Sequence, residues 1–243
     1  MSVLEVKNLT IQTIQKTVVS QATFSVDAGT ILGIIGESGS GKSTLCNGIM
    51  GLLPPSMTCE GDVLYDGKKI VRGRDVSMIT QHPMSAFNPL QTIGRHFIET
   101  LCAHHPLSKK EAHLKALEAL TSVQLSNAED VMKRYPVELS GGMLQRVMIA
   151  LQIVLDATLL IADEPTTALD TLNQKEILRL LRHRADEAGT AIIIVTHDLG
   201  VIAEIADTVV VMKDGKIVEY NDVWRCFDAP QHPYTKRLME ARG

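Results

Sequence analysis

Short, wholly apolar runs alternate along this chain with longer stretches of mixed apolar and charged residues. The runs "TILGIIG", "TLLIAD" and "TAIIIVTH" cover residues 30–36, 158–163 and 190–197. Continuous apolar runs of this length are typical of strands that are buried on both faces. Residues 173–189 and 199–207 have a helical pattern instead, and Gly189 is expected to end the first of these helices. Strands that alternate with helices predict a mainly parallel sheet with helices on both faces.

The rest of the pattern predicts three parts. Residues 1–82 begin with β-rich runs and are expected to form the first part of a core with a β subdomain, and residues 157–243 its second part with a C-terminal tail. Residues 83–156 read as an inserted helical subdomain, in which one helix opens on Ser108 with Glu111 three residues later, as in a capping box. Residues 208–220 predict a hairpin around Asp214–Gly215.

Composition and charge exclude several classes of protein. The 243 residues are 45% hydrophobic and 21% charged, as expected of a folded α/β chain, and the net charge of −4 does not favour a nucleic-acid-binding surface. The opening "MSVLEVKNLTIQ" does not have the layout of a secretory signal, and the apolar runs are too short to span a bilayer. The four scattered cysteines form no CxxC pair, so we expect free thiols without a metal or disulfide role.

A phosphate-binding loop is predicted directly after the first apolar run. The segment "GESGSGKST" fits the pattern GxxxxGK[ST] between a strand and a helix, which is the context this pattern requires. Backbone N–H groups and the helix N-terminus can surround phosphate oxygens, Lys42 can reach the β- and γ-phosphates, and the Ser43 hydroxyl can ligate Mg²⁺. A plain glycine turn before a helix is the alternative. The candidate residues are Gly36, Glu37, Ser38, Gly39, Ser40, Gly41, Lys42, Ser43 and Thr44.

Acidic, basic and amide side chains follow three other predicted strands. Asp163 and Glu164 close "LLIADE", where the aspartate could hold Mg²⁺ and the glutamate could orient or deprotonate a water molecule. His197 follows "IIIVT" and could donate a hydrogen bond to a γ-phosphate, and Gln81 ends "VSMITQ", where it could touch both metal and water. Ligands bind at the carboxyl edge of open α/β sheets, which favours a site over solvated acids and a structural histidine.

The segment "LSGGMLQR" (residues 139–146) begins a helix with two adjacent glycines, although glycine disfavours helices. Ser140 and the N–H groups of Gly141 and Gly142 form a helix N-terminus that can bind an anion. The absence of side chains indicates that another molecule approaches the backbone here; a glycine-rich cap without a ligand is the alternative.

The order of these motifs, with "TALD" after the acidic pair, resembles that of the ATP-binding-cassette (ABC) ATPases over essentially the whole chain. The resemblance implies a RecA-like P-loop core with a mainly parallel sheet, an antiparallel β subdomain and an inserted helical subdomain. It also implies ATP and Mg²⁺ as cofactors. Residues 36–44 resemble the Walker A loop, and Gln81 the Q-loop residue that contacts the metal. Asp163 and Glu164 resemble the Walker B aspartate and catalytic glutamate, His197 the switch histidine and Asp170 the D-loop aspartate.

The resemblance also implies partners. In this family the "LSGGQ" signature, here with Met143 in place of glutamine, caps the γ-phosphate of ATP bound by the opposite subunit. We therefore expect a head-to-tail dimer with a second ABC ATPase, either a copy or a paralogue. We also expect two integral-membrane permeases, an extracytoplasmic substrate-binding protein, and a peripheral location on the cytoplasmic face of the plasma membrane.

One family feature is missing from the sequence. The family usually places an aromatic residue upstream of the phosphate loop to stack on adenine, but the corresponding segment, "TIQTIQKTVV", offers only Ile11, Ile14, Val18 and Val19. Adenine is then expected to be held by aliphatic contacts.

Narrower features, "QHPMSAFNPLQTIG" and the ending "FDAPQHPYTKRLMEAR", resemble the peptide, nickel and metallophore importers. Peptide members generally continue into a cysteine-bearing extension, whereas this chain has no cysteine after Cys226. That difference favours nickel or a metal chelate as cargo over peptides. A non-transport ABC ATPase acting on DNA, ribosomes or iron–sulfur assembly is a further alternative, as is a regulatory module with little turnover.

Overall fold

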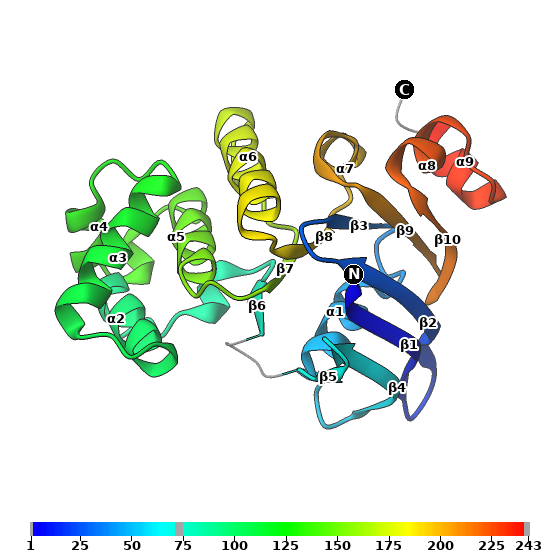
Figure 1. Cartoon of the computed structure of the whole chain (residues 1–243), viewed down its shortest axis with the longest axis horizontal. Helices are drawn as coiled ribbons and strands as arrows, with labels where there is room; N and C mark the ends of the chain where they lie inside the picture. Colours follow the sequence, from blue (N-terminus) through cyan, green and yellow to red (C-terminus); the bar gives the residue numbers. More distant parts are fainter. Residues whose placement is uncertain (1, 71–74, 241–243) are drawn as a thin grey trace.

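The computed structural model describes residues 2–70 and 75–240, which form two sheets and a set of helices (Figure 1). The larger sheet has the strand order β10-β9-β3-β8-β7-β6 and is parallel except for the β9–β10 pair; the smaller has the order β2-β1-β4-β5 and is antiparallel. The strands are β1 Ser2–Thr13, β2 Thr17–Asp27, β3 Ile31–Ile35, β4 Met57–Tyr65, β5 Lys68–Lys69, β6 Val76–Ile79, β7 Leu159–Asp163, β8 Ala191–Val195, β9 Thr208–Lys213 and β10 Lys216–Asp222.

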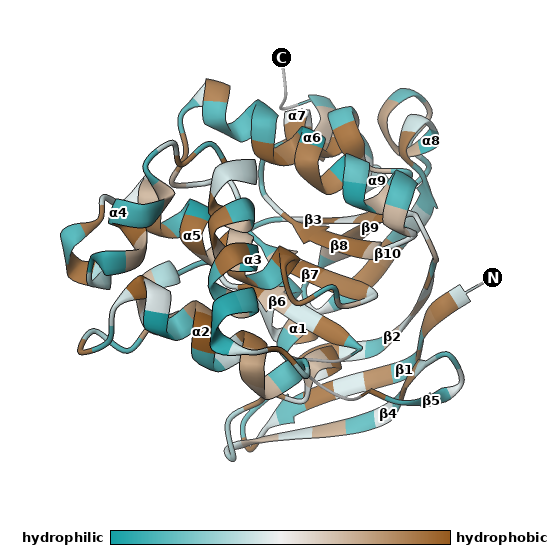
Figure 2. Cartoon of the chain, turned by 60° about the vertical axis from the view of Figure 1, so that its left-hand side comes forward, coloured by the Kyte–Doolittle hydropathy of each residue, from teal (hydrophilic) through white to brown (hydrophobic). Residues whose placement is uncertain are grey.

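The apolar runs form the centre of the larger sheet because both of its faces are covered. Every residue of β3, β7 and β8 is buried, and successive side chains pack into two different cores. Ile192 and Ile194 of β8 pack with the helices α6 (Thr171–Ala188) and α7 (Leu199–Ile205), whereas Ile193 packs with α1 (Lys42–Met50) and the smaller sheet. Figure 2 shows the larger sheet between these two layers. The predicted mainly parallel α/β fold is confirmed.

A separate group of helices lies on the β6 side of the larger sheet (Figure 1). The capping box predicted at the start of α3 is confirmed: the Ser108 hydroxyl accepts from the backbone N–H of Glu111, whose carboxylate accepts from the N–H of Ser108. The predicted boundaries 1–82, 83–156 and 157–243 stay a prediction, but these helices all fall within the middle range. They are α2 Ile93–His104, α3 Lys109–Ser122, α4 Ala128–Lys133 and α5 Gly141–Ile153, with the 3-10 turns η1 Pro83–Ala86 and η2 Pro136–Glu138.

The C-terminal part packs on the phosphate-loop end of the core. The hairpin predicted around Asp214–Gly215 forms from β9 and β10 and is followed by α8 (Val223–Asp228) and α9 (Pro233–Glu240). Its turn contacts two distant segments, because Gly215 donates its N–H to the carbonyl of Ser40 and accepts from the N–H of Ser20. The hairpin thereby supports the loop that follows β3.

Two sequence expectations concern the whole chain. The four cysteines are free thiols, two of them buried. Across residues 2–70 and 75–240, no helix combines the length and the apolar character needed to cross a membrane.

Two Asp-Gly turns allow a direct test of how tightly the β9–β10 hairpin is held. Asp66–Gly67 and Asp214–Gly215 both have positive φ angles, with 70° at Gly67 and 77° at Gly215. A Cβ added to Gly67 would meet nothing described within 4 Å, whereas one at Gly215 would lie 2.3 Å from the Val18 carbonyl oxygen. Gly67→Ala should therefore lower the free energy of unfolding by about 1–2 kcal/mol, the cost of left-handed backbone for alanine.

Gly215→Ala should cost about 1–3 kcal/mol more than Gly67→Ala, because the overpacking adds to the same backbone term. Urea denaturation of the two variants measures the difference. Equal losses of stability would show that the turn is free to move away from Val18.

Candidate functional site

Four neighbouring strands of the larger sheet end at one edge and bring the predicted site residues together. In spatial order these strands are β3, β8, β7 and β6, and all are parallel. Residues 36–44 follow β3, His197 lies two residues after β8, Asp163 ends β7, and Gln81 lies two residues after β6. Because Val195 pairs with both Ile34 and Asp163, the strand ends are level with one another. Parallel pairing therefore assembles residues that are more than 100 positions apart.

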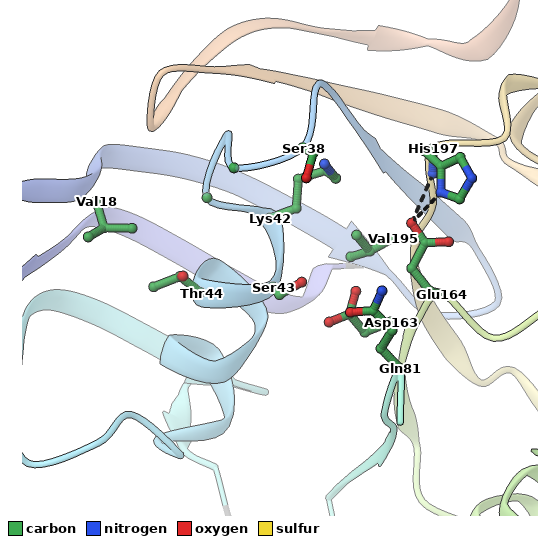
Figure 3. Close-up of a pocket in the computed structure, with 12 residues that line it drawn as sticks. Val18, Ser38, Lys42, Ser43, Thr44, Gln81, Asp163, Glu164, Val195 and His197 are labelled. Atoms are coloured by element: carbon green, nitrogen blue, oxygen red, sulfur yellow. Dashed lines mark hydrogen bonds and ion pairs between the residues drawn. The ribbon is translucent and has the colours of Figure 1, made fainter. Parts of the chain in front are cut away.

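These strand ends surround one open cavity, shown in Figure 3. Residues of the phosphate loop and α1 form one wall, and Gln81, Asp163, Glu164 and His197 form the opposite side. Gly36, Glu37 and Ser40, also predicted as loop residues, do not line it. The lining residues are Val18, Ser38, Gly39, Gly41, Lys42, Ser43, Thr44, Gln81, Asp163, Glu164, Val195 and His197.

The Lys42 ammonium group lies inside the loop. It is 9% exposed and donates hydrogen bonds of 2.8 and 2.9 Å to the carbonyl oxygens of Gly36 and Glu37. Burial lowers the pKa of Lys42, while the nearby Glu164 and Asp163 carboxylates act in the opposite direction. The loop therefore holds a cation at the floor of the cavity, where a phosphate group would meet it.

Asp163 is suited to hold a metal ion. The residue is 4% exposed, and its Oδ1 atom has no hydrogen-bond partner among the described residues. Burial raises the pKa of Asp163, against the opposing effect of a hydrogen bond from Ser43. A buried carboxylate oxygen without a partner is costly unless a ligand satisfies it. With the Ser43 hydroxyl and the Gln81 amide on the same cavity, the donor set consists of oxygen atoms, which suits Mg²⁺.

Glu164 is held by hydrogen bonds on both carboxylate oxygens. Its Oε1 accepts from the backbone N–H of His197 at 3.2 Å and faces the ring Nδ1 of His197 at 2.8 Å. Its Oε2 accepts from the hydroxyl of Thr167 at 2.8 Å and, more weakly, from that of Thr196 at 3.4 Å. Glu164 itself has a left-handed backbone, with φ 53°, and donates its N–H to the carbonyl of Val195. Such strained positions are concentrated at functional sites.

The signature segment and Asp170 do not line this cavity. Ser140 caps α5 by accepting from the N–H of Met143, and Asp170 caps α6 by accepting from the N–H groups of Leu172 and Asn173. A Cβ on Gly142 would lie 3.0 Å from the carbonyl oxygen of Ala168, so this glycine allows close packing within the chain. Gly141 is exposed, and a Cβ there would meet no described atom within 4 Å. This helix N-terminus is therefore accessible from the surface of the chain.

Sequence reasoning did not identify several contacts of the site. It missed Thr167 and Thr196, which hold Glu164, because threonine hydroxyls have no distinctive spacing. Of the four aliphatic residues considered for adenine, the structure places only Val18 on the cavity. Ile11 and Val19 are buried in the core, and Ile14 is 99% exposed at the β1–β2 turn.

Comparison with known proteins gives consistent matches. The family model "ABC transporter" matches residues 19–167. The probable D,D-dipeptide transport ATP-binding protein DdpD of Escherichia coli K12 is 41% identical, over 91% of this chain and 71% of its own length. The metal-staphylopine import system ATP-binding protein CntD of Staphylococcus aureus Mu50 is 40% identical, over 100% of this chain and 94% of its own. The dimeric structure of MJ0796, a bacterial ABC transporter cassette, superimposes with a TM-score of 0.81 at 28% identity, covering 90% and 98% of the two chains.

The contact between Thr167 and Glu164 can be tested with an isosteric variant. Thr167→Val removes the hydroxyl at Oε2 and keeps the shape of the side chain. Since a hydrogen bond to a charged group contributes about 1.5–3 kcal/mol, the rate of ATP hydrolysis should fall about tenfold or more. We expect nucleotide affinity to change less than about twofold, because the sequence predicts that Glu164 acts in the reaction and not in binding.

Thr158→Val is the matched control, since the Thr158 hydroxyl bonds to the Asp75 carbonyl outside the cavity. Steady-state kinetics and equilibrium nucleotide binding separate the two effects. Equal rates of ATP hydrolysis in Thr167→Val and Thr158→Val would mean that Thr167 does not position Glu164.

Proposed function

This chain belongs to the ABC transporter ATPases, in the group of peptide, nickel and metallophore importers, and on that premise we propose that it drives uptake of nickel or a metal chelate. As an ATPase subunit it binds and hydrolyses ATP, and the proposal places the reaction at a dimer interface with Mg²⁺ bound. One observation carries the proposed site of ATP hydrolysis: six of the predicted residues line the same cavity. They are Lys42, Ser43, Gln81, Asp163, Glu164 and His197.

The proposed roles follow from the contacts. Lys42 and the N–H groups of residues 38–44 hold the β- and γ-phosphates, and Ser43, Gln81 and Asp163 hold Mg²⁺. When bound, Mg²⁺ neutralises charge on the phosphate oxygens. Glu164 accepts a proton from the attacking water, whose oxygen bonds to the γ-phosphorus as the bond to the ADP oxygen breaks.

His197 has a more specific part in this scheme. Its Nδ1 atom faces Glu164, so the ring is held with Nε2 as its free nitrogen. We propose that this nitrogen donates a hydrogen bond to the γ-phosphate of bound ATP.

The second half of each site is proposed to come from another subunit. Ser140 and Gly141 are exposed at the start of α5, and a Cβ on Gly141 would meet no described atom within 4 Å. Asp170 is exposed and caps the start of α6. In the proposed head-to-tail dimer, each signature segment caps the ATP of the other subunit. The partner is a second copy or a paralogous ABC ATPase.

The proposed cargo follows from the relatives and from the sequence. CntD, named for metal-staphylopine import, matches along nearly the whole of both chains, which supports a metal chelate. DdpD, named for D,D-dipeptide transport, is equally identical, which supports the peptide alternative. In either case we propose two membrane permeases and an extracytoplasmic binding protein as partners. The chain would then lie on the cytoplasmic face of the plasma membrane.

The shared site can be tested by trapping ATP. Glu164→Gln should bind ATP, hydrolyse it at least about a hundredfold more slowly, and accumulate as a closed dimer, because the phosphate that joins the subunits stays in place. Adding Ser140→Arg should leave ATP binding by the separate subunit within about twofold but abolish the dimer. Size-exclusion chromatography in the presence of ATP measures dimer formation by both variants. It is run on the chain alone and on the chain co-expressed with the second ATPase of its system.

Ser122→Arg in the same background is the control, because Ser122 is an exposed serine elsewhere in the helical group. Loss of ATP binding by the isolated Ser140→Arg subunit would instead place the signature segment in its own chain's site.

The cargo needs a transport measurement. Cells that depend on this system should take up radioactive nickel, faster with a chelator if the cargo is a chelate, and a Glu164→Gln chain should reduce uptake to background. Competition by dipeptides with no effect of chelator would favour the peptide alternative over the metal.

A further inference from the structure

The C-terminal helix α9 reaches the phosphate loop from behind. Tyr234, the second residue of α9, is 3% exposed, and its hydroxyl oxygen accepts a 3.0 Å hydrogen bond from the backbone N–H of Glu37. Glu37 is the second residue of the loop motif. This contact joins residues that are 197 positions apart. Figure 2 shows α9 beside the β10 edge of the larger sheet.

Glu37 lies outside the lining of the cavity. The loop residues that line the cavity are Ser38, Gly39, Gly41, Lys42, Ser43 and Thr44, whereas Gly36, Glu37 and Ser40 do not line it. The outer side of the loop is held by other C-terminal contacts as well. A Cβ on Gly36 would lie 2.2 Å from the carbonyl oxygen of Met212, and Gly215 donates its N–H to the Ser40 carbonyl. The loop thus lies between the ligand cavity and the C-terminal elements, which contact it at Gly36, Glu37 and Ser40.

The peptide groups on both sides of Glu37 have assigned partners. Its N–H donates to Tyr234, and its carbonyl accepts from the Lys42 ammonium. Because these two groups belong to one residue, the tyrosine hydroxyl fixes the backbone that in turn fixes Lys42. Burial raises the pKa of Tyr234, so its hydroxyl stays neutral at physiological pH.

Tyr234 is itself anchored by the hairpin. The Glu219 carboxylate of β10 is 8% exposed and accepts from the N–H groups of Gln231 and His232, each at 3.0 Å. The Lys213 ammonium of β9 lies 5.1 Å from the centre of the Tyr234 ring, a cation–π contact. These contacts set the position of the tyrosine before any ligand binds.

We propose that Tyr234 is a positioning residue for the phosphate loop, and that residues 231–235 raise nucleotide affinity by holding Glu37 and, through it, Lys42. The tyrosine touches no ligand in this scheme. Its effect is preorganisation: a loop that is already ordered loses less conformational entropy when it binds phosphate. The proposal rests on the proposed use of this loop for ATP.

The chain contains a matched pair of tyrosines for the test. Tyr234→Phe keeps the buried ring and removes only the hydroxyl. Tyr220→Phe also removes one hydroxyl, which donates to the Ser25 carbonyl at 2.9 Å and does not face the cavity. Since a single hydrogen bond contributes about 0.5–1.5 kcal/mol, Tyr234→Phe should raise the Kd for ATP about fivefold, and Tyr220→Phe by less than about 1.5-fold.

Binding of a fluorescent ATP analogue and melting of the free proteins are measured together on the full chain. The expected result is a rise in Kd for Tyr234→Phe with melting temperatures that match those of Tyr220→Phe. The increase in melting temperature caused by ATP should shrink for Tyr234→Phe alone. Equal Kd values for the two variants, or losses of affinity that follow the melting temperature, would overturn the proposal.

The anchor gives an independent test. Glu219→Gln keeps one oxygen acceptor but replaces the second with an amide group that cannot accept, so the segment should loosen and Kd should rise two- to threefold. Combined with Tyr234→Phe it should add little further effect, because the anchor acts through the tyrosine. If the rise in Kd of the double variant equals the product of the two single rises, the anchor does not act through Tyr234. Wild-type ATP binding is the baseline: its absence would refute the proposed function, whereas a normal Tyr234→Phe variant refutes only this inference.

Discussion

The level alignment of four parallel strand ends is the constraint on which the site depends. Val195 pairs with Ile34 on one side and Asp163 on the other, so the loop after β3, the acidic pair at the end of β7 and His197 after β8 begin at the same level of the sheet. Side chains in a strand alternate between faces, and a slip of one residue would exchange the two cores that cover the sheet. The same burial that stabilises the sheet therefore fixes the relative positions of the phosphate-binding and acidic groups.

Much of this arrangement follows from local sequence, and the exceptions share a cause. Buried strands, the capping box at Ser108, the Asp214–Gly215 turn and the phosphate loop each depend on residues close together in the chain, so their patterns are visible in the sequence. The strand β4 was not predicted because all its residues from Thr58 to Asp62 are exposed and polar or small, without the alternation of a half-buried strand. Thr167 and Tyr234 were missed because their roles depend on partners brought near only by the fold.

The two adjacent glycines of the signature segment have different surroundings in the structure. Gly142 packs against the Ala168 carbonyl of the same chain, and its bare backbone is needed for that internal contact. Gly141 has no such neighbour among the described residues and is exposed. The sequence pattern predicts that both glycines approach the nucleotide. The structure adds an internal packing contact at Gly142 and leaves Gly141 exposed.

Lys42 shows why contacts behind the loop matter to a ligand in front of it. Its ammonium group already has two carbonyl partners, and hydrogen bonds to a charged group contribute about 1.5–3 kcal/mol each. A phosphate that draws the ammonium forward gains a strong ion pair but weakens these bonds, so affinity is the difference between two large terms. Both carbonyls belong to Gly36 and Glu37, the residues pressed against Met212 and bonded to Tyr234. Small displacements of the outer backbone therefore change the strength with which Lys42 is retained, and the C-terminal elements can alter phosphate binding without entering the cavity.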